Sequence, residues 1–311
     1  MSKVAFCFPG QGSQRVGMGR DFVAQFPEAA AVFDEASEEL DFDLRKVCFE
    51  GPIEELSQTE VTQPALVASS LAAFRAIQER LGVKPDVVVG HSVGEYAAIA
   101  AADSVGVGVV TRLVRERGLA MAASKARGAM AAILGLEAGA VIEGCMQAAD
   151  DLGTIVQAAN FNDPKQTVIA GTKAGVDKAC ELLKAAGAKR ALLLAVSAPF
   201  HSALMKPAAD RLRERLVTTP IDAPFIPVID NIDVRSESEP AAIRDALYRQ
   251  AFGAVRWVET IKALRARGIH HIFECGPGRV LAGMVKRIEP DAVSAAVSEP
   301  ESLAAAAALL R

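Results

Sequence analysis

Short apolar runs alternate with longer amphipathic stretches along the first 124 residues of the chain. The runs Val4–Phe8 and 86–89 have the length of buried strands. The stretches between and after them show helical periodicity, and we expect helices at 21–39, 63–81, 93–102 and 107–124. Buried strands that alternate with helices are typical of a parallel sheet with helices on both faces. The pattern therefore predicts an α/β fold.

The order of elements changes after residues 125–128. We expect strands at 130–134, 154–159, 166–170 and 190–196, with helices at 137–149 and 173–186. The turn-forming residues FNDPK separate the second and third of these strands. This βαββαβ order is typical of a ferredoxin-like subdomain. The sequence thus predicts a small ferredoxin-like subdomain at 128–196, inserted into a large α/β-hydrolase-like domain made of residues 1–127 and 197–311.

The large domain is expected to resume after the insert with further helices and strands. The pattern favours helices at 203–216 and Pro240–Gln250, strands at 226–229 and His271–Cys275, and a terminal helix in AAAAALLR. No internal repeat or low-complexity linker interrupts this segment.

Composition narrows the class of protein. Of the 311 residues, 51% are hydrophobic but only 5% are aromatic, so we expect an aliphatic core of helices packed on a sheet. The net charge of −4 gives no basis for a nucleic-acid-binding surface. The five cysteines are scattered without a C-x-x-C pair, which is typical of reduced thiols in a cytosolic protein. No apolar run has the length of a signal sequence or a membrane span, so we expect a cytoplasmic protein that binds no membrane.

The stretch DVVVGHSVGEY contains a G-x-S-x-G motif centred on Ser92, with a predicted strand before it and a predicted helix after it. This context is the one that a nucleophile elbow requires. The serine of such an elbow occupies a strained turn, and glycine on either side avoids clashes of Cβ atoms. A serine at this place could instead cap the helix, because serine is a favoured N-cap residue. The combined pattern favours Ser92 as a nucleophile.

A serine nucleophile needs a base, and the chain contains four histidines. His91 is adjacent to the serine on a tight turn, where neighbouring side chains usually diverge. His270 and His271 form a pair at the start of a predicted strand and are expected to face solvent. His201 follows a predicted strand in APFHSALMKP, which places it on the sheet edge that carries the elbow. We therefore predict His201 as the base.

The third member of a hydrolase triad would be an acid between Ser92 and His201. The aspartates in this interval are Asp103, Asp150, Asp151, Asp163 and Asp177. Asp103 lies at the end of the helix after the elbow, and the others fall in the predicted insert. None follows a strand of the large domain. The sequence therefore favours a Ser–His dyad whose imidazole is oriented by a carbonyl or an amide.

Two further segments carry polar residues that could serve a site. The loop PGQGSQ follows the first predicted strand, and it could cradle a phosphate, offer the backbone N–H of Gln11 to an oxyanion, or be a flexible connection. The phosphate-binding patterns G-x-x-x-x-G-K-[ST] and G-x-G-x-x-G are both absent. The segment RLVRERGLAM is rich in charges that normally face solvent. One arginine pointing inward would provide a fork for a carboxylate.

Several motifs together resemble those of malonyl-CoA:acyl carrier protein transacylases. They are, in chain order, PGQGSQ, GHSVGEYAA, the Arg117-Gly118 pair, GAMAAILGL, NFNDPKQTVIAG, APFHSALMKPA and FECGPGRVL. The resemblance extends over essentially the whole chain. It implies ping-pong transfer of malonyl from malonyl-CoA to the phosphopantetheine thiol of holo-acyl carrier protein, in fatty acid biosynthesis or in a polyketide pathway. It also implies a monomer without a resident cofactor or metal.

The resemblance implies roles for residues at the matching positions of this chain. Ser92 would carry the malonyl ester, His201 would be the base, and Arg117 would pair with the malonyl carboxylate. The backbone N–H groups of Gln11 and Val93 would form the oxyanion hole, and the main chain of Gln250 would orient the histidine. Asn160 and Asn162 would line the cleft between the domains, although turn formation before Pro164 also explains them.

Two positions differ from common versions of the family. Phe200 precedes the histidine where many relatives have serine, and a bulky ring there would exclude an α-methyl branch in favour of malonyl. Asp230 precedes Asn231 where Asn-Asn is more usual, so the resemblance assigns no role to Asp230. Because carrier proteins are acidic, we also expect a basic docking surface, with candidates at Lys189-Arg190, Lys206 with Arg211, and Lys286-Arg287.

Two other functions share part of this pattern. A serine thioesterase or hydrolase would use the same elbow and release the acyl group to water. A non-catalytic scaffold could keep the fold for protein contacts, but the presence of both Ser92 and His201 argues against it. An inward-facing Arg117 in a water-excluding site is the feature that would separate a malonyl transferase from a hydrolase.

Overall fold

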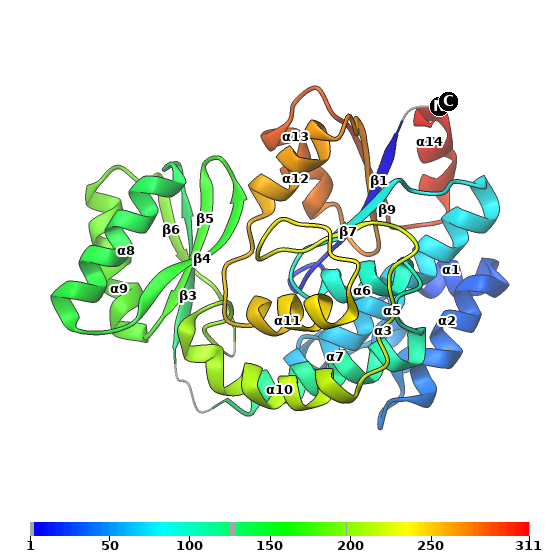
Figure 1. Cartoon of the computed structure of the whole chain (residues 1–311), viewed down its shortest axis with the longest axis horizontal. Helices are drawn as coiled ribbons and strands as arrows, with labels where there is room; N and C mark the ends of the chain where they lie inside the picture. Colours follow the sequence, from blue (N-terminus) through cyan, green and yellow to red (C-terminus); the bar gives the residue numbers. More distant parts are fainter. Residues whose placement is uncertain (1–2, 125–127, 197, 311) are drawn as a thin grey trace.

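The computed structural model describes residues 3–124, 128–196 and 198–310, which form a large and a small sheet with their covering helices (Figure 1). The large sheet has five strands in the order β7-β2-β1-β8-β9, and every pair is parallel. Its strands are β7 (Val228–Ile229), β2 (Val87–Gly90), β1 (Val4–Phe8), β8 (His271–Cys275) and β9 (Val293–Val297). The predicted parallel α/β architecture is confirmed.

The large sheet is buried on both faces because successive side chains of its central strand alternate between two cores. In β1, Phe6 and Phe8 point into the larger core, while Ala5 and Cys7 point into the smaller one. Helices of the larger core are α1 (Arg20–Gln25), α2 (Pro27–Glu38), α3 (Leu44–Glu50), α4 (Ile53–Leu56), α5 (Thr59–Leu81), α6 (Gly94–Ala101), α7 (Val107–Ala122), α10 (Lys206–Thr218), α11 (Pro240–Gln250) and α14 (Glu301–Leu309). Helices α12 (Trp257–Ala266) and α13 (Val280–Ile288) cover the other face.

The small domain is an antiparallel sheet in the order β4-β5-β3-β6, backed by two helices. Its elements are β3 (Ala129–Leu134), α8 (Ala138–Leu152), β4 (Val156–Asp163), β5 (Gln166–Gly171), α9 (Lys173–Ala185) and β6 (Arg190–Leu193). The third strand of the unit lies between the first and the second, as the ferredoxin-like split motif requires. The predicted ferredoxin-like subdomain is therefore confirmed in its topology.

The small domain contacts the large domain along β4. An isolated parallel bridge pairs Asn160 with Val255, and the carboxylate of Asp163 accepts from Nε of Arg287 at 2.6 Å. The predicted change of domain at 127–128 and 196–197 involves residues 125–127 and 197, which lie outside the described residues, so this boundary stays a prediction.

Several elements differ from those that the sequence pattern predicts. The single helix expected at 21–39 is two helices, α1 and α2, because Pro27 cannot donate a hydrogen bond to the preceding turn and starts a new helix instead. Short helices α3 and α4, helices α12 and α13 and strand β9 were not predicted. A 3₁₀ turn at Ala203–Met205 precedes α10, where one helix over 203–216 was expected.

The carboxyl ends of the central parallel strands meet the small domain at a cavity of about 560 Å³. Met130, Ala132 and Val168 line it from the small sheet, and Ser92 and His201 line it from the large domain.

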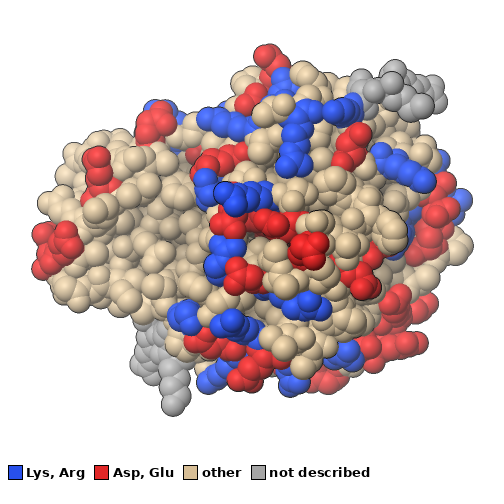
Figure 2. All heavy atoms as spheres, viewed as in Figure 1, with Lys and Arg blue, Asp and Glu red and all other residues tan. Residues whose placement is uncertain are grey.

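Figure 2 shows charged side chains crowding the visible face of the large domain, whereas the face of the small domain is largely uncharged. No helix among the described residues is long and apolar enough to cross a membrane.

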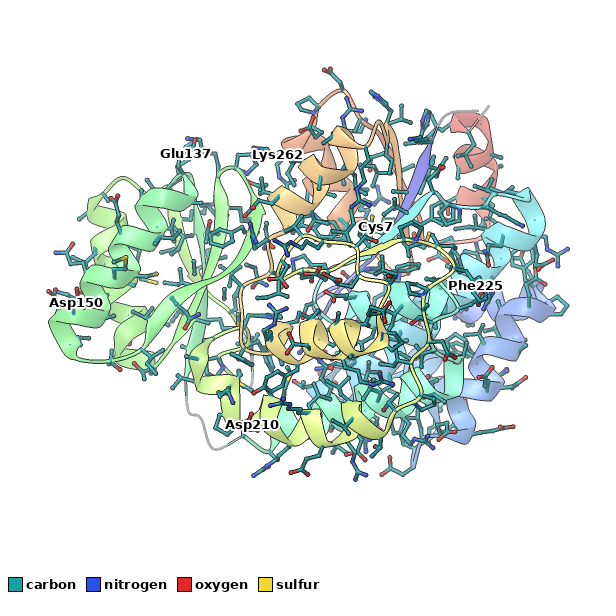
Figure 3. The ribbon with its side chains drawn as sticks, viewed as in Figure 1. Cys7, Glu137, Asp150, Asp210, Phe225 and Lys262 are labelled. Atoms are coloured by element: carbon teal, nitrogen blue, oxygen red, sulfur yellow. The ribbon has the colours of Figure 1, made fainter. Side chains whose placement is uncertain are left out.

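All five cysteines are buried and unpaired, in agreement with the prediction of reduced thiols. Figure 3 shows Cys7 inside the large domain, in the central strand, and Asp150 at the outer end of the small domain. Helix α7, which carries Arg117, runs alongside α5 and α10 in the large domain.

Candidate active site

Ser92 lies on a sharp turn between β2 and α6 that only glycine neighbours allow. A Cβ atom on Gly90 would meet the carbonyl carbon of Gly94 at 1.9 Å, and one on Gly94 would meet the carbonyl oxygen of Phe8 at 2.1 Å. Ser92 itself has φ of 54°, a left-handed conformation that non-glycine residues rarely adopt. Its side chain does not cap α6, whose N-cap residue is Val93. The turn therefore presents the Ser92 hydroxyl to the cavity.

The structure brings Ser92 and His201 together across 109 positions of sequence, with Oγ and Nε2 2.7 Å apart. Nδ1 of His201 donates to the backbone carbonyl oxygens of Gln250, at 2.9 Å, and Gly253, at 3.2 Å. These two acceptors fix the tautomer, because a proton on Nδ1 leaves the Nε2 lone pair facing the serine hydroxyl. Burial and the nearby charge of Arg117 lower the pKa of His201 to about 3, so the imidazole is neutral around pH 7.

None of the candidate aspartates contacts His201 within the described parts of the chain. Asp103 accepts from Arg75 at 3.0 Å and is exposed, while Asp163 is paired with Arg287. Asp150, Asp151 and Asp177 lie on the helices of the small domain. The orientation of the imidazole thus depends on carbonyl groups.

Arg117 points inward from α7 and is only 2% exposed. Its Nη1 donates to Oε1 of Gln63 at 2.8 Å, and its Nη2 donates to Oε1 of Gln250 at 3.1 Å and to Oγ of Ser92 at 3.3 Å. The guanidinium lies over the ring of Tyr96. No carboxylate forms an ion pair with Arg117 within the described residues. A buried cation beside the serine, held by neutral amides, is an arrangement suited to a substrate carboxylate.

The other arginines of this stretch of α7 pair with carboxylates outside the cavity. Arg112 pairs with Glu39 at 2.9 Å, and Arg115 pairs with Asp41 at 2.9 Å. The spacing explains the difference: Arg115 and Arg117 are two positions apart on a helix and so lie on different faces. Of the arginines in this stretch, only Arg117 reaches the cavity.

Gln250, at the end of α11, connects the parts of the site. Its backbone oxygen orients His201, its Oε1 accepts from Arg117, and its Nε2 donates to the backbone oxygen of Ser92 at 2.9 Å. Nε2 also lies 2.9 Å from Oε2 of Glu95, to which it donates. The side chain of Gln250 is therefore as closely engaged as its main chain.

Three residues that hold the site were not predicted as site residues: Gln63, Glu95 and Asn231. Oδ1 of Asn231 accepts the backbone N–H of Ser92 at 2.7 Å, and its Nδ2 donates to the carbonyl oxygen of Gly90 at 2.6 Å. Glu95 accepts from the backbone N–H of Asn231 at 2.9 Å. These contacts join segments more than 130 positions apart, so no local pattern reveals them.

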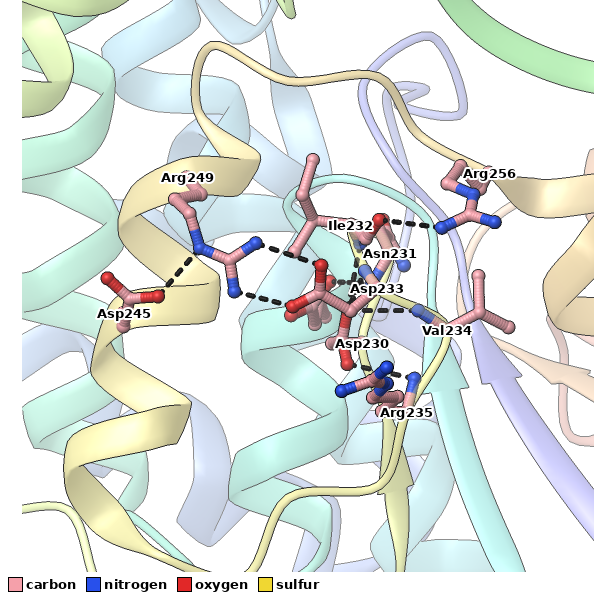
Figure 4. Close-up of polar contacts among 10 residues, drawn as sticks. Asp230, Asn231, Ile232, Asp233, Val234, Arg235, Asp245, Arg249 and Arg256 are labelled. Carbon is pink, nitrogen blue, oxygen red and sulfur yellow. Dashed lines mark hydrogen bonds and ion pairs between the residues drawn. The ribbon is translucent and has the colours of Figure 1, made fainter.

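The loop after β7 is organised around Asp230 (Figure 4). The Asp230 carboxylate accepts from the backbone N–H groups of residues 232, 233, 234 and 235 at 2.5–3.2 Å. Arg249 of α11 adds two hydrogen bonds to Asp233, at 2.9 and 2.5 Å. An asparagine at position 230 would offer only one acceptor oxygen for these donors. Asp230 thus fixes the loop that carries Asn231.

The residues predicted for the oxyanion hole and the substrate-lining wall all border the cavity. Gln11, Val93, Phe200, Asn160 and Asn162 line it. Within the described part of the chain, the backbone N–H groups of Gln11 and Val93 donate to no protein acceptor. The loop that carries Gln11 is ordered by its own contacts, including the bond from the N–H of Gly12 to Oε1 of Gln14 at 2.7 Å. Oδ1 of Asn162 lies 2.9 Å from Nε2 of His91.

The other three histidines lie away from the serine hydroxyl. His91 is packed edge-on against Trp257 and bonds Asn162, and burial lowers its pKa. His270 is exposed, as expected, but His271 is half-buried in β8, where a solvent-facing side chain was predicted. No group of three or more His, Cys, Asp or Glu side chains in the described ranges is arranged to hold a metal ion.

The three candidate basic clusters differ in how their charges are engaged. Lys206 pairs with Asp210 at 2.6 Å, and Arg287 pairs with Asp163. Lys189 and Arg190 are exposed at the start of β6, and neither forms an ion pair with a described residue. Their charges are therefore the most available of the three for an acidic partner.

Comparisons with known proteins extend these observations. Residues 5–300 match the acyl transferase domain family. The chain is 46% identical to the malonyl CoA-acyl carrier protein transacylase of Escherichia coli K12, over 98% of this chain and 99% of that protein. The acyl-carrier-protein S-malonyltransferase of Burkholderia pseudomallei is 49% identical, with a TM-score of 0.95 and coverage of 98% and 99%. A malonyl transacylase solved in complex with a type II polyketide synthase acyl-carrier protein is 45% identical, with a TM-score of 0.95 and coverage of 99% and 100%.

Proposed function

The chain belongs to the acyl transferase domain family, and from this premise we propose that it works through a malonyl ester on Ser92. It is an acyltransferase that moves malonyl from malonyl-CoA to the thiol of holo-acyl carrier protein. The observation that carries the mechanism is the buried guanidinium of Arg117, whose Nη2 lies 3.3 Å from a serine hydroxyl that is itself 2.7 Å from a neutral imidazole.

In the first half-reaction, Oγ of Ser92 attacks the thioester carbonyl carbon of malonyl-CoA, and Nε2 of His201 takes the hydroxyl proton. The carbonyl oxygen becomes an oxyanion, which the N–H groups of Gln11 and Val93 stabilise. The C–S bond then breaks, His201 returns the proton to the coenzyme A thiolate, and the malonyl group remains on Ser92. Each such N–H donor contributes about 10²–10³-fold in rate.

In the second half-reaction, the phosphopantetheine thiol of the carrier protein attacks the malonyl ester. His201 accepts the thiol proton and then gives it to Oγ of Ser92 as the ester bond breaks. Both half-reactions exchange one acyl bond for another, so they need neither an oxidant nor a reductant. We therefore propose that the enzyme has no resident cofactor.

Arg117 selects the acyl group in this proposal. The malonyl carboxylate lies two bonds from the reacting carbonyl carbon and would bind the guanidinium next to Ser92. A charge-assisted pair of this kind is worth about 1.5–3 kcal/mol. Acetyl-CoA lacks the carboxylate and would leave the buried cation unpaired.

Phe200, next to His201, and Asn160 and Asn162, on β4, line the same cavity as the dyad and would set the shape of the acyl pocket. We propose that the buried ring of Phe200 excludes an α-methyl branch, and that Asn160 and Asn162 contact the substrate from β4. Replacement of Phe200 by serine should raise acylation by methylmalonyl-CoA relative to malonyl-CoA. Unchanged selectivity in this variant would argue that the ring is only part of the core.

We also propose the cellular setting and the division of the chain. Free, buried cysteines support a reducing compartment such as the cytoplasm. We place the product in fatty acid biosynthesis, with a polyketide pathway as the alternative. The large catalytic domain would comprise residues 1–127 and 197–311, with the subdomain at 128–196 covering the site.

Labelled malonyl-CoA tests the proposal. The wild-type protein should form a base-labile adduct, and holo-carrier protein should clear it far faster than water does. Ser92→Ala should form no adduct, and His201→Ala should form it at least about 10³-fold more slowly. An adduct that water clears as fast as the carrier does would identify a thioesterase instead.

A further inference from the structure

Glu95 is a buried carboxyl group that the proposed transfer does not use. It lies in the first turn of α6, three residues after the nucleophile, and is 2% exposed. Carboxyl groups are rarely buried to this degree unless they are paired. Within the described residues no lysine or arginine forms an ion pair with Glu95, so a cation does not account for its burial.

The hydrogen bonds of Glu95 lead to both backbone polar groups of Ser92. Its Oε2 accepts from the N–H of Asn231 and from Nε2 of Gln250, each at 2.9 Å. Asn231 in turn accepts the N–H of Ser92, and Gln250 donates to the oxygen of Ser92. One carboxyl oxygen therefore holds the backbone of Asn231 and the side chain of Gln250, the two residues whose side chains fix the strained serine backbone.

The same network reaches the other groups of the site through Gln250. The backbone oxygen of Gln250 orients His201, and its amide lies between Glu95 and Arg117, with Nε2 toward the carboxyl group and Oε1 toward the guanidinium. Displacement of this residue would move the nucleophile, the base and the buried cation together.

Burial and the charge of Asp230 disfavour the ionised form of Glu95, whereas Arg117 favours it. The carboxylate of Asp230 faces it from the loop after β7, and Arg117 faces it from α7. The Asp230 carboxylate accepts four backbone N–H groups. Burial, followed by the repulsion of Asp230, raises the pKa of Glu95 to about 8, against the smaller opposing effects of its hydrogen bonds and of Arg117.

We propose that Glu95 is the positioning residue of the dyad, and that it acts as the neutral acid so that the positive potential of Arg117 is available to the malonyl carboxylate. The carbonyl oxygen of a neutral carboxyl group has two lone pairs and can accept both N–H bonds, although more weakly than a carboxylate does. An ionised Glu95 would instead compensate Arg117 through the amide of Gln250 and would repel a second carboxylate. This inference rests on the proposed Ser92–His201–Arg117 mechanism.

Ionisation of Glu95 should weaken the binding of malonyl-CoA at alkaline pH. As pH rises through about 8, Glu95 loses its proton, and malonyl-CoA should bind less tightly. Acetyl-CoA carries no carboxylate and should show no such change. Acylation of Ser92 is the step to measure, because no carrier thiol takes part in it.

The experiment compares Glu95→Gln and Glu95→Ala by single-turnover acylation from pH 6.5 to 9.5. In the wild type, the malonyl-CoA concentration that gives half-maximal acylation should rise with pH above 8. If malonyl-CoA binds only the form with neutral Glu95, this rise is about tenfold per pH unit. Glu95→Gln keeps a neutral acceptor, so it should acylate within tenfold of the wild-type rate, without this rise. Glu95→Ala removes the acceptor and should lower the maximal rate on the order of 10²-fold at every pH.

Glu274→Gln is the matched control, since Glu274 is equally buried but caps α13 through the N–H of Ala282 at 2.8 Å and contacts neither Asn231 nor Gln250. It should keep the alkaline rise. The inference is overturned if Glu95→Gln is as slow as Glu95→Ala, if it retains the wild-type rise, or if Glu95→Ala acylates at the wild-type rate. Absence of an adduct in the wild type would instead overturn the proposed function itself.

Discussion

The two walls of the cavity differ in how their side chains are buried and hydrogen-bonded. On the wall of the large domain, His201 and Arg117 are buried beside the half-buried Ser92, and the polar groups are bonded to one another through Gln250 and Asn231. The wall of the small domain combines aliphatic side chains from β3 and β5 with the amides of Asn160 and Asn162 from β4, and its edge strand β6 is largely exposed. The groups that must keep fixed distances for catalysis thus lie on the wall of the large domain, which we call the interlocked wall. The wall of the small domain, which we call the open wall, is available to partners.

The largest expected difference between the two walls is in how they tolerate an added methyl group at a glycine. Gly94→Ala should lower the free energy of unfolding by about 3 kcal/mol or more, because its Cβ would meet the oxygen of Phe8 at 2.1 Å, and acylation should be lost. Gly139→Ala, in α8 of the small domain, is the control because nothing lies within 4 Å of its added Cβ. That variant should gain up to about 1 kcal/mol. Thermal and denaturant unfolding measure both, and equal losses would contradict the contrast.

Arg117→Ala tests the buried cation of the interlocked wall. We expect a loss of about 10–100-fold in acylation by malonyl-CoA, with acetyl-CoA acylation kept or raised, since only malonyl carries a carboxylate. Competition between the two labelled thioesters measures the ratio. A loss that is equal for both substrates would assign Arg117 to the support of the fold.

The pH dependence of acylation tests the environment of His201. Its pKa is lowered to about 3, by burial first and by Arg117 second, so the base stays unprotonated as pH falls below 6.5. The rate with malonyl-CoA should therefore be flat from pH 7 to 5. In Arg117→Ala the second cause is removed, and the acidic decline should move to higher pH. A wild-type rate that halves near pH 6.5 would show an imidazole exposed to water.

The smallest effect is expected on the open wall. The double variant Lys189→Ala, Arg190→Ala should weaken use of holo-carrier protein about fivefold at low salt, and less at high salt, without changing acylation by malonyl-CoA. Lys206→Ala is the control, because its ammonium is already paired with Asp210. An equal effect of both variants would remove the distinction between free and paired charges.

Local patterns accounted for most of the fold. Strands β1 and β8 and helix α11 begin and end where their apolar periodicity does, and the βαββαβ order of the insert is visible in the sequence. The missed elements lack such contrast: α13 follows the glycine-rich stretch ECGPGR, and β9 is made of small, half-buried residues. Helix α12 begins at the chain's only tryptophan, in a stretch that was not assigned to any element.

Residue patterns alone could predict site residues only where the motif is a contiguous stretch of the sequence. The elbow around Ser92 is contiguous, and its steric requirement follows from backbone geometry alone. His201 required an argument about which sheet edge it occupies, and the roles of Gln250 and Arg117 came from resemblance. Glu95 and Asn231 could not be inferred, because their importance arises from contacts 136 and 139 positions apart.

Both reactive residues have a left-handed backbone conformation, which makes the active sequence less stable than some inactive variants of it. Ser92 has φ of 54° and His201 has φ of 58°, conformations that are unfavourable by about 1–3 kcal/mol each outside glycine. Glycine at either position would relax the chain and remove a reactive group at the same time. Selection for thermostability alone would therefore favour inactive descendants, and activity has to be selected directly for the dyad to persist.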